Sequence, residues 1–187
     1  MQAGIAKEKI FADRKNYYED EPFDSDENDD QKFQSDDDNS LQGAFRKDEK
    51  YEGYFKIGEP YEIEGTTYFP QNYEHFEEVG TASWYGADFH GKQTANGEIY
   101  NSGDMTAAHR TLPLPSIVRV TNLSNNKSAI VRVNDRGPFA KNRVIDVSQK
   151  VAEVLEFKNK GTADVKVELM REDTDSMLDS LGILNKE

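Results

Sequence analysis

The sequence predicts a mainly β protein, a small closed barrel that carries one or two short helices and follows a disordered acidic tail. Short segments of alternating apolar and polar residues recur between residues 79 and 170, and polar turn sequences separate them. A single strong helical pattern lies among these segments. Short strands with one helix favour a sheet closed around one apolar interior.

Composition limits the classes of protein that the chain can represent. Its 187 residues suffice for one domain and a tail, and the 35% of hydrophobic residues is low for a chain folded from end to end. Neither a membrane-spanning apolar run nor a signal peptide is visible. Cysteine is absent and the three His residues are scattered, so we expect no disulfide, no metal site and no cofactor.

The net charge of −13 is unevenly distributed. Residues 1–50 carry 15 acidic and 8 basic side chains, whereas residues 79–170 carry 9 acidic and 12 basic ones. The acidity therefore lies in the flanks, and the central region is mildly basic. A basic cleft attracts anionic polymers, although a surplus this small does not distinguish nucleic acid from an anionic glycan.

The segments that flank the barrel are expected to differ in structure. Residues 1–50 are predicted to be an acidic disordered tail, an inert spacer or a site for linear interaction motifs, because repulsion and few apolar groups leave ordering entropy uncompensated. Residues 51–78 form an aromatic-rich arm with a hairpin around Gly65, which packs on the barrel or, alternatively, offers rings to sugars. Residues 171–187 are predicted to hold an amphipathic helix that is broken at Gly182.

Residues 79–170 carry the barrel itself. Its strands are predicted at residues 79–85, 117–121, 130–133, 144–147 and 165–169, with a polar hairpin loop over 122–127. Ser148 is expected to cap a helix that runs through Phe157, with Val151, Val154 and Leu155 facing inward.

Asp135 is the first candidate for chemistry. It follows an alternating strand and precedes a rigid turn, in which Gly137 permits positive φ and Pro138 fixes the exit of the chain. A carboxylate at that place points into a cleft or, alternatively, accepts hydrogen bonds from its own turn.

Glu98 and His109 are the two further candidates. Glu98 follows the tight-turn pair Asn96-Gly97, and the alternative is an exposed loop residue. His109 follows Thr106-Ala107-Ala108, and the alternative is a buried hydrogen-bonding residue. With Asp135 they make an acid–base constellation of the kind that glycoside cleavage requires.

The aromatic residues Trp84, Tyr85 and Phe89 are candidates for stacking on sugar rings, with core packing as the alternative for Trp84. The sequence contains no G-x-S-x-G, H-E-x-x-H or P-loop pattern, which argues against those chemistries.

Six ordered segments of the chain resemble one protein family. They are Gly80-Thr81-Ala82-Ser83-Trp84-Tyr85-Gly86, Phe89-His90-Gly91, Thr94-Ala95-Asn96-Gly97-Glu98, Thr106-Ala107-Ala108-His109, Val120-Thr121-Asn122-Leu123 and Val133-Asn134-Asp135-Arg136-Gly137-Pro138-Phe139. In this order they resemble the rare lipoprotein A family of septal lytic transglycosylases. The resemblance covers about residues 51–170.

The resemblance implies a six-stranded double-psi β-barrel and an endolytic peptidoglycan lytic transglycosylase. Such an enzyme cleaves the bond between N-acetylmuramic acid (MurNAc) and N-acetylglucosamine (GlcNAc) without water and leaves 1,6-anhydroMurNAc ends. The implied substrate is a glycan strand without stem peptides, and the implied role is cell-wall remodelling or daughter-cell separation.

Carried over by motif, Asp135 is the acid that protonates the glycosidic oxygen and then takes the proton of the C6 hydroxyl, while Glu98 and His109 orient or tune it. Such an acid keeps its proton through burial or a neighbouring carboxylate, and an Arg136 guanidinium directed at Asp135 would oppose this. The residues expected to bind the glycan are Trp84, Tyr85, Phe89, Asn96, Asn134, Arg132 and Arg136.

The implied partner is the peptidoglycan glycan strand, with envelope or division proteins bound by the acidic tail and no nucleic acid. The implied location is the periplasm or outer membrane of a Gram-negative bacterium, as a lipoprotein. The chain departs from the family pattern because it has no lipid-bearing Cys and no following glycan-binding domain. Two alternatives stay open: a non-catalytic wall-binding module, as in expansins, and an envelope scaffold.

Overall fold

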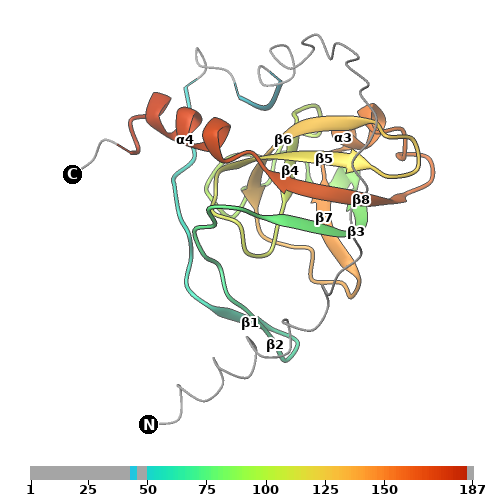
Figure 1. Ribbon diagram of the computed structural model, residues 1–187, viewed down its shortest axis with the longest axis horizontal. Helices are drawn as coiled ribbons and strands as arrows, with labels where there is room; N and C mark the ends of the chain where they lie inside the picture. Colours follow the sequence, from blue (N-terminus) through green and yellow to red (C-terminus); the bar gives the residue numbers. More distant parts are fainter. Residues whose placement is uncertain (1–42, 46–49, 185–187) are drawn as a thin grey trace, which may run out of the picture. The chain divides into compact units, whose positions relative to one another are not determined.

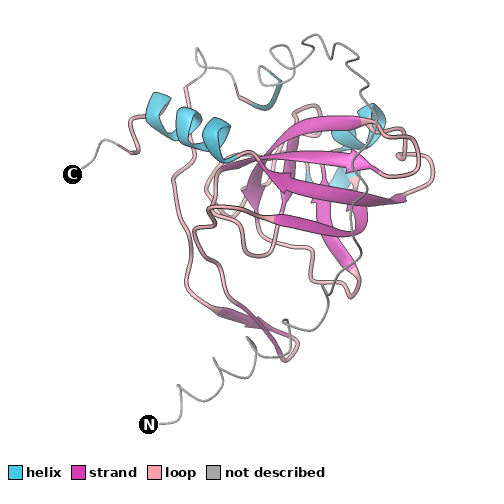
Figure 2. Cartoon of the chain, in the orientation of Figure 1, coloured by secondary structure: helices cyan, strands magenta, loops and turns pink. Residues whose placement is uncertain are grey.

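The computed structural model describes residues 43–45 and 50–184, and its centre is a closed barrel of six strands (Figures 1 and 2). Most of the predicted acidic tail lies outside the described residues. The barrel strands are β3 (Glu77–Trp84), β4 (Thr106–Ala108), β5 (Ser116–Asn122), β6 (Ser128–Asp135), β7 (Arg143–Val147) and β8 (Thr162–Leu169).

The strands close in the order β3-β7-β4-β6-β5-β8. The pairs β3/β7 and β4/β6 are parallel, and the other four pairs are antiparallel. Alternate residues of each strand point inward and form one core, which includes the fully buried Val118, Val131 and Val165. The predicted mainly β barrel is therefore confirmed.

Strand β4 is the barrel strand that the sequence did not predict. Its three residues, Thr106–Ala108, are all buried, so they show no alternation of apolar and polar side chains. It pairs with β6 on one side and with β7 on the other. A segment this short becomes a strand through its neighbours rather than through its own periodicity.

The predicted helix is present as α3 (Gln149–Val154) and is shorter than expected. The Ser148 side chain caps it by accepting a hydrogen bond from the Val151 amide at 3.2 Å. The predicted inward orientation of Val154 is wrong, because its side chain is 39% exposed. The chain leaves the helix at Leu155, and the ring of Phe157 fills the core there instead.

The arm before the barrel holds the predicted hairpin, β1 (Tyr61–Ile63) and β2 (Thr66–Tyr68), which turns at Gly65 with a φ of +77°. The rings of Tyr61 and Tyr68 stack with centroids 5.3 Å apart. Phe139, from the loop after β6, meets the Tyr61 ring edge-on at 6.0 Å. The hairpin is thereby packed against the chain that follows Asp135.

Helix α4 (Arg171–Ser180) lies against the outside of the barrel (Figure 1). The Thr174 hydroxyl accepts a hydrogen bond from the Ile117 amide on β5 at 2.9 Å. Met177 and Leu178 pack with Ile117 in a second apolar cluster. Among the described residues, no helix has the length and hydrophobicity needed to span a membrane.

We predict that Gly80→Ala lowers the free energy of unfolding by about 1–3 kcal/mol, the usual cost of overpacking. A Cβ at position 80 would lie 2.4 Å from Cγ1 of Val144 on the neighbouring strand. Urea denaturation measures the change through the midpoint of unfolding. Gly86→Ala is the matched control, since a Cβ there meets nothing within 4 Å. Equal midpoints for the two variants would contradict the prediction.

Candidate active site

A β-bulge places two consecutive side chains of β6 on the candidate site. The pairing of β4 with β6 shifts by one residue after Ala107, so that Asp135, rather than Asn134, stands opposite Ala108. Bulges commonly redirect side chains in this way. As a result, Asn134 and Asp135 both bond to the loop formed by residues 94–98.

The loop of residues 94–98 is the tight turn that the sequence predicted. The Thr94 amide donates to the Glu98 carbonyl at 2.8 Å, and Gly97 adopts a φ of +91°. The Thr94 hydroxyl donates to the Asn96 side chain at 2.9 Å and closes the turn from within. The turn therefore presents the Ala95 amide and the Glu98 carboxylate to the end of β6.

The Asp135 carboxylate is partly exposed and accepts hydrogen bonds from three donors. Its Oδ1 accepts from the amides of Ala95 and Arg136, both at 2.8 Å. Its Oδ2 accepts from the Tyr85 hydroxyl at 3.3 Å. All three groups only donate in these bonds, so they hold the carboxylate as an acceptor in one orientation.

Tyr85 is the side chain that connects Asp135 to the rest of the barrel. Burial raises the pKa of the Tyr85 hydroxyl far above its usual range, and the charges of Asp135 and Asp146 raise it further. The hydroxyl thus stays protonated and keeps donating to Asp135. Its ring lies 4.9 Å from that of Tyr100, which fixes its position.

Glu98 is 7% exposed and bound to its neighbours through both carboxylate oxygens. Its Oε2 accepts from Arg132 Nη2 at 2.7 Å and from the side-chain amide of Asn134 at 2.9 Å. Its Oε1 accepts from the side-chain amide of Asn96 at 3.0 Å. Burial alone would raise the pKa of Glu98, but the Arg132 charge and the amide donors outweigh it and lower the pKa.

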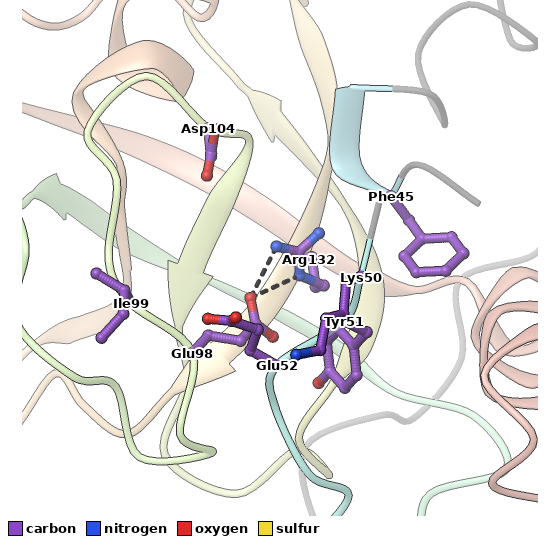
Figure 3. A pocket seen from close by; sticks show the side chains of 8 residues that line it. All are labelled: Phe45, Lys50, Tyr51, Glu52, Glu98, Ile99, Asp104 and Arg132. Atoms are coloured by element: carbon purple, nitrogen blue, oxygen red, sulfur yellow. Dashed lines mark hydrogen bonds and ion pairs between the residues drawn. The ribbon is translucent and has the colours of Figure 1, made fainter. Parts of the chain in front are cut away.

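Residues before the barrel cover this ion pair from outside (Figure 3). The Arg132 guanidinium also donates to the Ala44 carbonyl. The Tyr51 hydroxyl accepts a hydrogen bond from the side-chain amide of Asn96 at 2.8 Å. A polar pocket remains between the barrel and the chain that precedes it, and Glu98, Arg132 and Tyr51 are among the residues that line it.

His109 is buried, and its side chain is directed away from Asp135. Its Nε2 lies 3.2 Å from a Glu78 carboxylate oxygen, and its Nδ1 accepts from the amides of Thr111 and Leu112. Burial lowers the pKa of His109, and this effect outweighs the Glu78 carboxylate. Only the main chain of His109 reaches Asp135, since its amide donates to the Asp135 carbonyl at 3.1 Å.

Arg136 directs its guanidinium at main-chain carbonyls rather than at Asp135. It donates to Leu112 at 2.6 Å and to Ile57 in the arm at 2.7 Å. The guanidinium therefore ties the arm to the barrel. Arg136 follows Asp135 in the sequence, but its guanidinium bonds these carbonyls and not the Asp135 carboxylate.

The three predicted stacking residues divide in the structure. The Trp84 ring packs against the core and donates to the Lys158 carbonyl at 3.2 Å. Tyr85 bonds Asp135, as described above. Phe89, at the end of the short helix η1 (Ala87–Phe89), is 49% exposed, and Lys92 Nζ lies 5.2 Å from its ring centroid.

The structure therefore brings together Asp135, Glu98, Asn96, Asn134 and Tyr85 and leaves the side chains of His109, Trp84 and Arg136 outside this group. Sequence reasoning missed the Ala95 amide, because main-chain donors have no residue signature. It also missed Tyr51, which the pattern grouped with the arm. Among the described residues, no cluster of three His, Asp or Glu side chains could hold a metal ion.

Comparison with known proteins gives a family match over the barrel. Residues 77–167 match a family model described as "Lytic transglycolase", a double-psi β-barrel. The chain is 54% identical over 125 residues to a Rickettsia felis protein named "Endolytic peptidoglycan transglycosylase RlpA". It is 63% and 57% identical, over 105 and 108 residues, to proteins of that name from Pseudomonas aeruginosa and Neisseria meningitidis.

The matched regions are parts of longer proteins. They cover 65%, 56% and 57% of this chain, and 55%, 31% and 45% of the Rickettsia, Pseudomonas and Neisseria proteins. The chain thus spans about half or less of the length of these relatives. The solved structure of a Streptomyces papain inhibitor is similar over 50% of this chain and 94% of the inhibitor chain, at 18% sequence identity. Its TM-score of 0.40 is too low to support an inference.

We predict that Glu98→Gln destabilises the protein at neutral pH by roughly 2–4 kcal/mol, somewhat below the ~3–5 kcal/mol typical of a fully buried pair. Because the pKa of Glu98 is lowered in the folded protein, its charge stabilises the fold above the unfolded pKa of about 4.5. That contribution is lost as the pH falls through the folded value. The difference from the wild type in urea unfolding should therefore shrink as the pH falls below the unfolded pKa of Glu98.

Glu153→Gln is the control for this prediction. Glu153 also accepts from a cation, Lys158 at 2.7 Å, but that pair lies on the surface. Surface pairs contribute little to stability, because water and salt screen them. A loss in Glu98→Gln no greater than in this control would show that the Arg132 pair does not stabilise the fold.

Proposed function

We propose that the barrel of this chain belongs to the rare lipoprotein A family of double-psi β-barrels and that it cleaves peptidoglycan glycan strands as an endolytic lytic transglycosylase. The observation that carries the proposal is the Asp135 carboxylate. It is partly exposed at the end of β6 and held in one orientation by three donors. A fixed, accessible carboxylate is the group that proton transfer at a glycosidic bond requires.

The proposed reaction consumes no water. A carboxylic acid donates a proton to the glycosidic oxygen, and the bond from that oxygen to C1 of MurNAc breaks. The C6 hydroxyl of the same MurNAc bonds to C1, and its proton passes to a carboxylate. The products are a GlcNAc end with a free hydroxyl and a 1,6-anhydroMurNAc end, so the enzyme recovers its proton. We assign Asp135 as a carboxylate that takes part in these proton transfers at the reacting MurNAc.

We propose that Glu98 and His109 act as positioning residues. Glu98 holds Asn134 and Asn96, and so fixes the turn that presents the Ala95 amide to Asp135. The His109 amide bonds the Asp135 carbonyl, while its imidazole fixes the following chain through Thr111. Neither side chain needs to contact the sugar to support this role.

The exposed aromatic rings near Asp135 suit a sugar polymer. Phe89 is 49% exposed and lies 5.5 Å from the Tyr85 ring, which itself bonds Asp135. Tyr54 is 53% exposed and donates to the Ala95 carbonyl on the turn beside Asp135. Flat rings of this kind match the apolar faces of pyranoses. We propose Phe89 and Tyr54 as stacking residues, one from the barrel and one from the arm.

We propose action in the cell envelope, where peptidoglycan lies. Attachment to the outer membrane as a lipoprotein and recruitment of envelope proteins by the acidic tail are further proposals, and they follow from the family and from the charge of residues 1–50.

A non-catalytic wall-binding module is the second candidate function. The observation that favours it is the internal ion pair of Glu98 with Arg132, which engages the carboxylate of one of the expected catalytic residues. A binding module would retain peptidoglycan without forming anhydro ends. Product analysis therefore separates the two candidates.

We predict that the wild-type protein releases anhydroMurNAc fragments from purified peptidoglycan lacking stem peptides and that Asp135→Asn lowers the rate at least about 10²-fold, as expected for loss of an acid–base group. Asn keeps the size of the side chain but cannot exchange the proton. Mass spectrometry identifies the product, because anhydro ends weigh one water less than hydrolysed ends.

Sedimentation with insoluble peptidoglycan is the companion measurement. Asp135→Asn should still bind if the fold is intact. Binding by the wild type without any anhydro product would support the wall-binding module. Full activity of the Asp135→Asn variant would remove Asp135 from the reaction.

A further inference from the structure

A second aspartate lies on the same face of the barrel as Asp135. In the ladder pairings, Ser83 of β3 stands opposite Asp146 of β7, Asp146 stands opposite Ala108 of β4, and Ala108 stands opposite Asp135 of β6. Residues opposite one another in a sheet point to the same face. The two aspartates therefore flank Ala108, one strand away on each side.

The separation of the two aspartates along the sheet can be compared with that of paired-acid glycosidases. At a strand spacing of about 4.8 Å, their Cα atoms are roughly 10 Å apart. The residue between them is Ala108, which is 1% exposed. Carboxyl groups of paired-acid glycosidases lie about 5–9.5 Å apart across the bond that they cleave. Two side chains that lean toward the alanine reach that range.

Tyr85 bonds one of the two aspartates and is influenced by the charge of the other. Its hydroxyl donates to Asp135, and both Asp135 and Asp146 disfavour its ionisation. The phenol therefore stands close to both acids, at the end of β3.

The surroundings of Asp146 are those of a proton donor. Burial raises the pKa of its carboxyl, and this effect outweighs the Ser83 hydroxyl, which donates to Oδ1 at 2.7 Å, and the Arg143 charge, 3.5 Å away. Asp146 thus keeps its proton to higher pH than an exposed aspartate. The charged or titratable groups nearest to it along the sheet are Arg143 on its own strand, Tyr85 after β3 and Asp135, which lies one strand beyond the uncharged Ala108.

The surroundings of Asp135 are the complement. Every group that bonds its carboxylate is a donor, and two of the three are main-chain amides. These bonds hold the carboxylate in one orientation as a hydrogen-bond acceptor. The row across the sheet therefore combines a carboxyl group that burial keeps protonated, Asp146, with a carboxylate that its neighbours hold in one orientation, Asp135.

We propose that Asp146 is the second catalytic carboxylate of this barrel, which protonates the glycosidic oxygen while Asp135 accepts the proton of the C6 hydroxyl. The inference rests on the proposed transglycosylase function and assigns its two proton transfers to different residues. The C1–oxygen bond breaks as Asp146 gives up its proton, and the C6 oxygen bonds to C1 as Asp135 gains one. Exchange with solvent returns both carboxyls to their starting states.

The test measures the rate of anhydroMurNAc release from stem-free peptidoglycan against pH. We expect Asp146→Asn to lower the rate about 10²–10⁴-fold, the usual contribution of a general acid. In the wild type, the rate should fall as the pH rises through the pKa of Asp146, and this alkaline limb should be absent from the residual activity of the variant. Asp164→Asn is the matched control. Asp164, on β8, also accepts a hydrogen bond from a hydroxyl of β3, that of Thr81, but it is exposed and does not belong to the row of Ser83, Asp146, Ala108 and Asp135.

Ser83→Ala provides a second variant that does not remove the acid. The Ser83 hydroxyl stabilises the ionised form of Asp146, so its loss should raise the pKa of Asp146 and move the alkaline limb to higher pH. A purely structural role of Asp146 would lower the rate without moving this limb.

The outcomes separate the two levels of the proposal. No anhydro product from the wild type would overturn the transglycosylase function itself. Normal wild-type activity that is lost in Asp135→Asn but unchanged in Asp146→Asn, with the same pH profile, would overturn only the role of Asp146. Loss in Asp146→Asn with an unmoved alkaline limb in Ser83→Ala would also overturn it, because the acid would then lie elsewhere.

Discussion

The candidate site depends on the bulge between β4 and β6. Two parallel strands meet there, and the extra residue on β6 lets Asn134 and Asp135 both bond the turn of residues 94–98. The same turn positions Glu98 for its ion pair with Arg132. Without the one-residue shift, adjacent side chains of a strand would point to opposite faces. The irregularity of the ladder is therefore what assembles the polar site.

The chain before the barrel is part of this site. Arg136 holds the Ile57 carbonyl, Arg132 holds the Ala44 carbonyl, and the Tyr51 hydroxyl completes the bonds of Asn96. Arg132 and Arg136, which the sequence analysis assigned to glycan binding, thus hold the chain that precedes the barrel. Charge near a site in sequence is a weak guide to what that charge contacts, since a guanidinium reaches several acceptors.

Much of the fold could be predicted from local sequence. Alternation predicted the strands that became β3, β5, β6, β7 and β8, the Ser148 cap predicted the start of α3, and Gly65 predicted the hairpin turn. Strand β4 could not be predicted, because all three of its residues are buried and lack a period. The predicted inward orientation of Val154 was wrong because the helix ends there. Phe157 occupies the core instead of Val154.

The sequence by itself determined the turns and strand ends on which Asp135 and Glu98 lie, because glycine and proline act on the adjacent residues alone. Only the tertiary structure decided which groups these carboxylates meet. It turned the His109 imidazole toward Glu78, tied Trp84 to the Lys158 carbonyl and set Asp146 in one row with Asp135. These outcomes follow from the closure of the barrel, and strand order and register between distant segments leave no trace in local periodicity.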